Sequence, residues 1–507
     1  MLPRSLFLLL GAALASQASA VESDAISLRD ALAATLRENP ALRIDAAVVE
    51  QRSGLLQQSS GAFDWNAFID VNAFRNRTPA FRPPALSSID RTDELAYSFG
   101  LSRRLRNGII LRPNAEVSVF DQVSPSATSF DGGASAVNFE ILVPLLRGLG
   151  NDSTGAAEAA ARGDVKVAKL LYQHSLATQA FFTAANYWAS RAADDAFAVQ
   201  RDVERAAERL VESTKVLVDS RIFPPAFLLQ AEANLREKRT VRIDAELSAR
   251  SARFTLGQAL GLPPERIADT PAPLDSFPPV VAEAAITSAE NRTPMIRRAL
   301  AARADYLASR ESLVPLNLLA RQAVIDLKPR LDLSVSVGYR GLSDNNDAVS
   351  PLHDRMTGGN GRLGLSFDWP FNNSYQRGLL RERRANIDQV EAQTVQLSQI
   401  VASDVLLSLE QLRLRADAVR SAQDTVNLSE RALAAQYEQL KTGEGTILDV
   451  ISLENISSGA RIRYINAHAA YATALAQLRF ALGAVFEESG APDTPYTLAD
   501  LTTPPSL

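Results

Sequence analysis

The sequence predicts a mainly α-helical protein with a β-barrel portion. In this fold class, long antiparallel helical hairpins form an α-barrel tunnel, and several chains share one transmembrane β-barrel. Three observations lead to this prediction. The pentapeptide RFTLG at 253–257 returns as RFALG at 479–483, which indicates that one structural unit is written twice. Each half carries one very long segment with almost no helix-breaking residue. Each half also carries short segments in which apolar and polar residues alternate.

The repeat defines the predicted domain organisation. Pro144 and Pro370 are 370 − 144 = 226 positions apart, the same spacing as between Arg253 and Arg479. Each half then follows one order: medium helix, strands, long helix, tight turn and medium helix. A proline-rich stretch separates the halves and is a linker by composition. We therefore expect a first structural repeat at 21–261, a Pro-rich connector at 262–283, a second structural repeat at 284–486 and a Pro-rich C-terminal tail at 487–507.

The N-terminus has the pattern of a secretory signal peptide. Arg4 supplies a positive charge, Ser5 to Leu14 form a short apolar core, and Ala18-Ser19-Ala20 is an A-x-A cleavage site. The apolar core is too short for a permanent transmembrane helix. We expect residues 1–20 to be removed on export and the mature chain to begin near Val21. The alternative is a buried core helix.

The helical segments predict a tube. Asp152 to Ser220 and Tyr375 to Lys441 would each be about 100 Å long at 1.5 Å per residue. The medium helices, near 26–60 and 226–261, would be about 50 Å each, so two stacked end to end match one long helix. The second long helix also carries a coiled-coil seam with a seven-residue period. Its members are Leu412, Val419, Val426, Leu433 and Leu440.

The alternating segments predict strands with one apolar and one polar face. The clearest are 331–339 (LDLSVSVGY) and 361–369 (GRLGLSFDW), with similar patterns near 63–72 and 95–102 and looser ones at 109–120 and 135–143. At nine to eleven residues these strands can cross a tilted barrel wall. Aromatic residues near their ends suggest an interfacial girdle. The girdle candidates are Trp65, Tyr339, Trp369 and Phe371.

Four to six strands are too few to close a lipid-embedded barrel, and unpaired edges in lipid are forbidden. Closure must therefore come from several chains. A water-soluble sandwich is the alternative reading of the same alternation. The Asn107-Gly108 turn suggests two extra strands in the first half, and whether they join the barrel is left open.

Composition argues against several other functions. The chain has no cysteine and a net charge of −5, so disulfides, thiolate metal sites and a basic nucleic-acid surface are not expected. The three histidines show no metal-ligand spacing, and no catalytic or phosphate-binding motif is present. We therefore expect no enzyme, no cofactor, no metal site and no nucleic-acid partner.

Two motifs resemble the TolC-type outer-membrane efflux channel family, also called outer membrane efflux proteins. Gly443 to Val450 (GEGTILDV) looks like the family's periplasmic tip, and Ile141 to Gly148 (ILVPLLRG) like its strand-to-helix exit. The resemblance covers nearly the whole mature chain. It implies a homotrimer with four strands per chain, a twelve-stranded barrel and a helical tunnel across the periplasm. It also implies a periplasmic adaptor (membrane fusion) protein and an inner-membrane transporter as partners.

The resemblance also supplies the site residues. Asp449 matches the acid that rings the tunnel entrance, and Ser452 stands where the family often has a second acid. Thr446-x-x-Asp449 is equally a helix capping box, so capping alone could explain this aspartate. The first-half turn at 221–225 lacks the glycine pattern, which weakens the match there. The expected tip-turn and adaptor-contact residues are Arg221, Phe223, Lys441, Gly443, Glu444, Gly445 and Thr446.

The sequence thus predicts an exit duct in the outer membrane with a long periplasmic extension. It would conduct cargo passively for a tripartite efflux or type I secretion system. The alternative is a non-channel periplasmic scaffold or adaptor built from a helical hairpin. Cargo, pump class and the resting state of the tip are not predicted.

Overall fold

The computed structural model describes most of the chain as two compact units. It describes residues 25–82, 85–123, 130–280, 289–344, 350–353, 356–442, 444–491, 494–498 and 501–503. The predicted signal peptide and Gly443 lie outside these residues. Unit 1 is Met1–Ala47, Leu170–Leu307 and Gln396–Leu507; unit 2 is Val48–Lys169 and Ala308–Val395. No helix within the described ranges is long and apolar enough to span a bilayer.

Nine α-helices and several short 3-10 helices carry most of the described backbone. The α-helices are α2 (Leu28–Glu38), α3 (Pro40–Ser60), α4 (Asn151–Thr154), α5 (Ala156–Asp219), α6 (Pro225–Leu260), α7 (Arg292–Ala302), α8 (Ala304–Asp326), α9 (Ser374–Thr442) and α10 (Ile447–Ala481). The 3-10 helices are η1 (Gly61–Phe63), η2 (Pro264–Asp269), η4 (Ala289–Asn291) and η5 (Ser350–Leu352). At 1.5 Å per residue, α5 and α9 are each about 100 Å long, as predicted.

The first predicted medium helix is two helices. Ser27 caps α2 by accepting a hydrogen bond from the Asp30 backbone N–H, and Asn39 is the C-cap that follows Glu38. Asn39 precedes Pro40 and has extended backbone angles (φ −62°, ψ 122°), because the proline ring disfavours the helical conformation of the residue before it. A single helix over 26–60 is therefore wrong. The second half has a similar break at Arg303 (φ −68°, ψ 119°), between α7 and α8.

The two similar pentapeptides, RFTLG and RFALG, do not occupy equivalent places in the fold, because their positions differ by one helical turn. Gly261 follows α6 with φ +80°, and Gly483 follows α10 with φ +67°. A Cβ on Gly261 would lie 2.7 Å from the Glu38 carbonyl carbon, and one on Gly483 would lie 2.9 Å from that of Ala302. These two glycines occupy equivalent places, 483 − 261 = 222 positions apart. Gly257, the glycine of RFTLG, lies inside α6 instead.

Unit 1 is held together by two apolar clusters between its helices. The larger contains Val401, Val405 and Leu412 of α9 against Leu475 and Leu478 of α10. The predicted coiled-coil seam of α9 is buried at Leu412, Val419 and Val426 and half-buried further along the helix. The other cluster surrounds Tyr187 and Trp188, both fully buried, where α2, α5, α6 and α10 meet. Two short pairs of strands complete the unit: β1 (Ala25–Ile26) with β6 (Ala272–Pro273), and β9 (Phe486–Ala491) with β10 (Thr494–Leu498).

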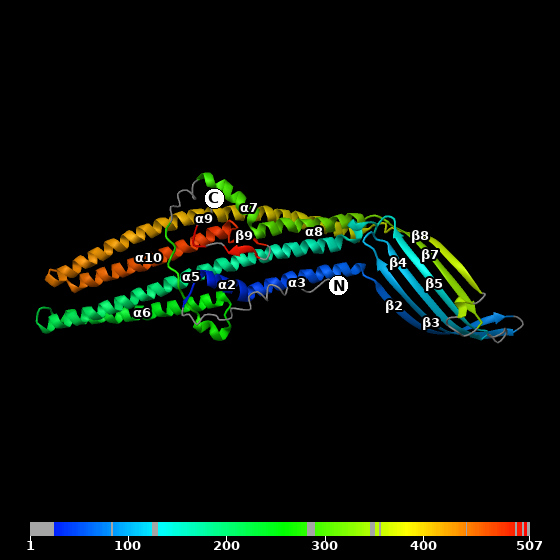
Figure 1. The fold of residues 1–507 in the computed structure, drawn as a ribbon, viewed down its shortest axis with the longest axis horizontal. Coiled ribbons are helices and arrows are strands. Elements are labelled where there is room, and N and C mark those ends of the chain that lie inside the picture. Colours follow the sequence, from blue (N-terminus) through cyan, green and yellow to red (C-terminus); the bar gives the residue numbers. More distant parts are fainter. Residues whose placement is uncertain are drawn as a thin grey trace. The chain divides into compact units, whose positions relative to one another are not determined.

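Unit 2 contains one antiparallel sheet of six strands in the order β2-β3-β4-β5-β7-β8 (Figure 1). Their bounds are β2 (Asn66–Arg82), β3 (Ala85–Arg104), β4 (Ile110–Val123), β5 (Phe130–Pro144), β7 (Arg330–Ser343) and β8 (Thr357–Asp368). Every strand exceeds the predicted nine to eleven residues, because pairing continues beyond the alternating pattern. Four strands per chain, as the resemblance implied, is wrong for this chain, and the hairpin at Asn107-Gly108 belongs to the sheet.

Candidate functional site

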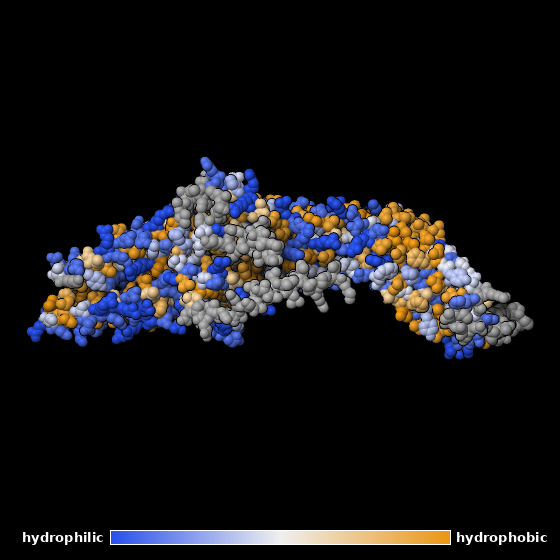
Figure 2. Space-filling view, in the orientation of Figure 1, coloured by the Kyte–Doolittle hydropathy of each residue, from blue (hydrophilic) through white to orange (hydrophobic). Residues whose placement is uncertain are grey.

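One face of the six-stranded sheet is apolar and exposed. Directly paired residues point to the same side, so Ile69 (79% exposed), Phe99, Val137 and Leu363 (75% exposed) belong to one surface. Hydrophobic surface gathers over these strands (Figure 2). Exposed apolar area of this extent marks an interface with lipid or another apolar partner. Its other large exposed members are Trp65, Val71, Tyr97, Leu101, Phe139, Val337, Tyr339, Leu365, Phe367 and Trp369.

The opposite face is largely polar. It carries Asp70, Asn72 and Ser98 in β2 and β3, with Glu116 opposite Ser98 in β4. Its charges are partly paired across strands, as between Arg112 Nη1 and Glu140 Oε2 at 3.6 Å. Small residues are frequent here, and a Cβ on Gly100 would collide with the Phe68 ring at 2.6 Å. A polar, small-residue surface opposite an apolar one is the arrangement of a wet barrel lumen.

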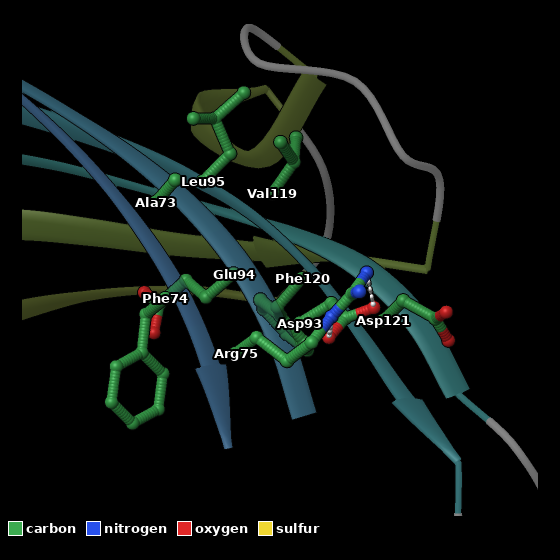
Figure 3. A pocket seen from close by; sticks show the side chains of 9 residues that line it. All are labelled: Ala73, Phe74, Arg75, Asp93, Glu94, Leu95, Val119, Phe120 and Asp121. Carbon is green, nitrogen blue, oxygen red and sulfur yellow. Dashed lines mark hydrogen bonds and ion pairs between the residues drawn. The ribbon is translucent and has the colours of Figure 1, made fainter. Parts of the chain in front are cut away.

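A row of ion pairs ends the apolar face at the end of the strands far from their helices. Arg75 Nε lies 2.7 Å from Asp93 Oδ1, and Arg91 lies 3.3 Å from Asp93 and 3.1 Å from Asp121. Figure 3 shows the row Arg75-Asp93-Asp121 beside the two preceding rows, Phe74-Glu94-Phe120 and Ala73-Leu95-Val119, around a groove of about 360 Å³. The change from Leu95 to Asp93 on one face marks where the apolar band stops.

The other border of the apolar face carries aromatic and basic residues. The Arg103 guanidinium lies 5.5 Å from the centre of the Trp65 ring, a cation–π contact. Trp369 and Phe371 lie just beyond β8 with ring centres 6.3 Å apart, and Phe371 is 92% exposed. These three aromatic residues occupy the helix-proximal border. Tyr339 lies within β7 instead, paired with Val137 and Gly359, and is four residues from the strand end.

The two borders are separated by the height of a bilayer's apolar core. Asp93 and Arg103 are 103 − 93 = 10 residues apart on β3, which is about 34 Å along a strand. A strand tilt of about 40° reduces this to about 26 Å along the barrel axis. Outer-membrane barrels have an apolar band about 25 Å tall. The spacing of the charged borders therefore matches a membrane-spanning sheet.

The turn between α9 and α10 is built around the predicted capping box. Thr446 Oγ1 accepts a hydrogen bond from the Asp449 backbone N–H at 3.3 Å, and Asp449 Oδ2 accepts one from the Thr446 backbone N–H at 3.2 Å. Glu444 and Gly445 both donate their N–H groups to the Gln439 carbonyl, which reverses the chain. Asp449, Ser452, Glu444 and Thr446 are exposed. Lys441 lies in the last turn of α9.

The turn between α5 and α6 reaches the same reversal by other means. Arg221 has φ +61°, an unusual value for a residue with a side chain, and it is exposed. The N–H groups of Ile222 and Phe223 both donate to the Leu217 carbonyl. Pro225 begins α6 at its first position, where a missing N–H costs nothing. Phe223 packs on Phe227 at 5.3 Å, so two prolines and an aromatic pair replace the glycines of the other turn.

A buried polar seam joins the two hairpins of unit 1, and sequence analysis missed it. Lys238 of α6 donates a hydrogen bond to Asn455 of α10, and Tyr437 of α9 donates one to Glu454. Lys238 and Glu454 are only 7% and 5% exposed. Burial raises the pKa of the Glu454 carboxyl, and the nearby Tyr437, Lys238 and Arg209 only partly oppose this. Within the described residues Asn234, one turn before Lys238, has no hydrogen bond to its amide atoms.

The seam is a weak point in the packing between hairpins. Buried polar groups that lack partners cost about 1–3 kcal/mol each. Polar residues recur every four positions at Gln230, Asn234 and Lys238, a spacing that puts them on one helix face. That spacing was the available signal, although sequence alone does not say that the face is buried.

The described residues include no group of three or more acidic or histidine side chains placed to hold a metal ion. His174 instead packs in unit 1 against Phe480 at 5.7 Å, beside a cavity of about 640 Å³. Burial lowers the pKa of the His174 imidazole, with Asp305 opposing and Arg303 reinforcing the shift. Arg303 itself pairs with Asp305 at 2.7 Å and Asp404 at 2.8 Å, which fastens the α7–α8 break to α9.

The comparison with family models decides between a channel family and an unrelated helical scaffold. The model described as outer membrane efflux protein matches residues 295–484, which run from α7 through α8, the β7–β8 hairpin and α9 to the end of α10. Residues 295–484 are similar to the outer membrane efflux protein family. The resemblance predicted from sequence is confirmed by this match.

Solved structures of outer-membrane channels have the same fold over nearly the whole chain. The outer-membrane channel OprN is 15% identical with a TM-score of 0.66, covering 90% of each chain. The CmeC channel of Campylobacter jejuni is 15% identical with a TM-score of 0.66, covering 91% of this chain and 86% of its own. VceC of Vibrio cholerae is 16% identical with a TM-score of 0.65, covering 90% and 96%. No curated protein matches the chain.

Proposed function

We propose that the chain is the outer-membrane exit duct of a tripartite efflux or type I secretion system. The observation that carries this proposal is the six-stranded sheet, with an exposed apolar face about 26 Å high between charged borders and a polar opposite face. A periplasmic scaffold has no use for a lipid-facing sheet. The match to the outer membrane efflux protein family supports the same assignment.

The proposed assembly is a homotrimer in the outer membrane with a long periplasmic extension, exported by the segment at 1–20. A single six-stranded sheet leaves the outer backbone edges of β2 and β8 unpaired, and unpaired edges are not tolerated in lipid. Copies of the chain supply the missing neighbours. The helices form the tunnel, and the two hairpin turns meet a periplasmic adaptor and an inner-membrane transporter.

Transport through this duct is passive. The chain acts as a conduit rather than an enzyme, and the inner-membrane partner supplies the energy. Three copies of Asp449, exposed at the α9–α10 turn, place negative charge around the entrance and favour cations there. The aspartate keeps its capping role, because one carboxylate can accept the Thr446 N–H and still present a free edge.

Ion conductance of the mature protein in a planar bilayer tests the proposal. The measurement compares the native protein with a Lys238→Ala/Glu454→Ala variant, which removes the buried contacts between the two hairpins. Arg413→Ala/Glu410→Ala, an exposed ion pair within α9, is the matched control. We expect discrete, cation-preferring steps in the ionic current. These steps should be larger or more frequent only in the Lys238→Ala/Glu454→Ala variant. Silence from every membrane-inserted variant contradicts a channel, and extraction by salt without detergent favours the scaffold.

A further inference from the structure

The β3–β4 hairpin sits inside the wall of the sheet rather than beside it. β3 pairs with β2 from Ser102 to Ala85, and β4 pairs with β5 from Ile110 to Gln122. β3 and β4 also pair with each other over most of their length. Removing the hairpin would therefore leave a gap two strands wide between β2 and β5.

The turn of this hairpin is fastened to the start of the long helix α5. Arg106 donates two hydrogen bonds to the Glu158 carboxylate, at 2.7 and 2.9 Å, and the Glu158 side chain is only 8% exposed. The Arg106 guanidinium also lies 4.9 Å from the Phe63 ring centre. The Gly150 N–H donates to the Asn107 carbonyl at 2.9 Å. The turn is thus part of the packed base of unit 2.

Gly108 makes this docking possible. It has φ +95°, and a Cβ at this position would lie 2.0 Å from the Gly148 carbonyl oxygen. Only glycine fits both the backbone conformation and the close approach. The apolar and polar faces also continue through β3 and β4 without a break in phase, since Tyr97 pairs with Val117 and Ser98 with Glu116.

The two edges of the sheet are compatible with closure by further copies. Because all neighbouring strands are antiparallel and their number is even, β2 and β8 run in opposite directions. β8 of one chain can therefore pair with β2 of the next in the same antiparallel pattern. Any number of copies keeps this pattern, so the copy number alone sets the number of strands.

We infer that three copies close a barrel of eighteen strands, so that the exit is wider than a twelve-stranded barrel. This inference rests on the proposed trimeric duct. With strands about 4.8 Å apart and tilted about 40°, eighteen strands give a backbone diameter of about 36 Å, against about 24 Å for twelve. Side chains about 5 Å deep leave a bore of about 26 Å rather than about 14 Å, which suits bulky or chain-like cargo.

Imaging the full-length oligomer in lipid nanodiscs counts strands and copies directly. Eighteen strands support the inference. A twelve-stranded trimeric barrel with the β3–β4 hairpin outside the wall overturns the inference and leaves the duct intact. A particle with no closed barrel overturns the duct itself, so the two failures are distinguishable.

Cysteine labelling tests the same point in the membrane, because the chain has no cysteine of its own. Ser98→Cys and Glu116→Cys, a directly paired set on the polar face, should react with a membrane-impermeant maleimide. Tyr97→Cys and Val117→Cys, the neighbouring pair on the apolar face, are the matched controls and should be at least tenfold slower in lipid. Equal rates on both faces would mean that the hairpin is not part of the wall.

Deleting residues 83–129 joins β2 to β5, which are also antiparallel, and restores four strands per chain. In the Lys238→Ala/Glu454→Ala background, we expect open-channel conductance to fall about three- to fourfold, following the cross-sectional area of the bore. The size of polyethylene glycol that enters the pore should fall in parallel. A correctly inserted deletion variant with unchanged conductance and polymer cut-off would refute the wider exit. If the deletion variant does not fold, the cysteine-labelling experiment still tests whether the β3–β4 hairpin is part of the barrel wall.

Discussion

Replacing Phe99 by arginine tests which face of the sheet meets lipid. Phe99 lies midway between Asp93 and Arg103 on β3, on the apolar face, and its side chain is 52% exposed in the single chain. Half of an aromatic side chain is about 100 Å² of surface, worth about 2.5 kcal/mol when lipid covers it. An arginine near the middle of the bilayer costs about 2–4 kcal/mol more. We therefore expect Phe99→Arg to destabilise each chain by about 5 kcal/mol.

Ser98→Arg is the matched control, one residue away on the opposite face. Its new guanidinium would lie between Asp70 and Glu116 and near water, so we expect a change below about 1 kcal/mol. Urea unfolding of the protein in lipid vesicles, followed by the gel shift between folded and unfolded forms, measures both variants. Equal losses in the two variants would refute a lipid-facing apolar surface. A greater loss in Ser98→Arg would mean that the two faces have been assigned in reverse.

Three further predictions concern unit 1. Tyr187→Phe should lower its unfolding free energy by about 1.5–3 kcal/mol in urea, because the buried hydroxyl donates to Asp275 Oδ2 at 2.8 Å and accepts from its N–H at 3.0 Å; an unchanged midpoint would contradict this. Burial raises the pKa of Glu454, so this group favours folding below its unfolded value of about 4.3 and loses that contribution as pH rises through its folded value. Glu454→Gln should therefore be more stable than the native protein at pH 8 and not near pH 4; a gap independent of pH would exclude ionisation as the cause. Thr446→Ala should weaken the α10 cap by about 1 kcal/mol yet keep the cation preference, whereas Asp449→Asn should reduce that preference in bilayer recordings; equal selectivity in both would leave Asp449 with capping alone.

Local patterns predicted the elements, and contacts between distant segments set their limits. The alternation at 331–339 and 361–369 identifies strands because side-chain direction has a period of two. The strands extend further because residues such as Arg75 and Asp93 pair across the ladder, where alternation has ended. The break at Asn39 had a visible cause in Pro40, and a single helix was predicted across it. The equivalent break at Arg303 carries no such signal, since Ala304 follows it.

The residues of the candidate site also differ in whether local sequence could predict them. The capping box at Thr446 and Asp449 could be predicted because both partners lie within four residues. The seam between Lys238, Tyr437 and Glu454 could not, because 454 − 238 = 216 residues separate its ends and each side chain alone resembles a solvated one. The one-turn offset of RFTLG had the same origin: sequence identity aligned Gly257 with Gly483, whereas the close approach to the preceding helix pair singles out Gly261.

The open edges of the six-stranded sheet also govern how quickly the protein can be made. A closed barrel from one chain can insert as soon as that chain folds, at a rate independent of its concentration. A sheet whose edge strands β2 and β8 are unpaired until they meet other copies cannot enter lipid alone. If the proposed trimer forms, insertion of this chain should follow its collision with two other copies, and halving its expression should slow the appearance of membrane-embedded protein far more than twofold.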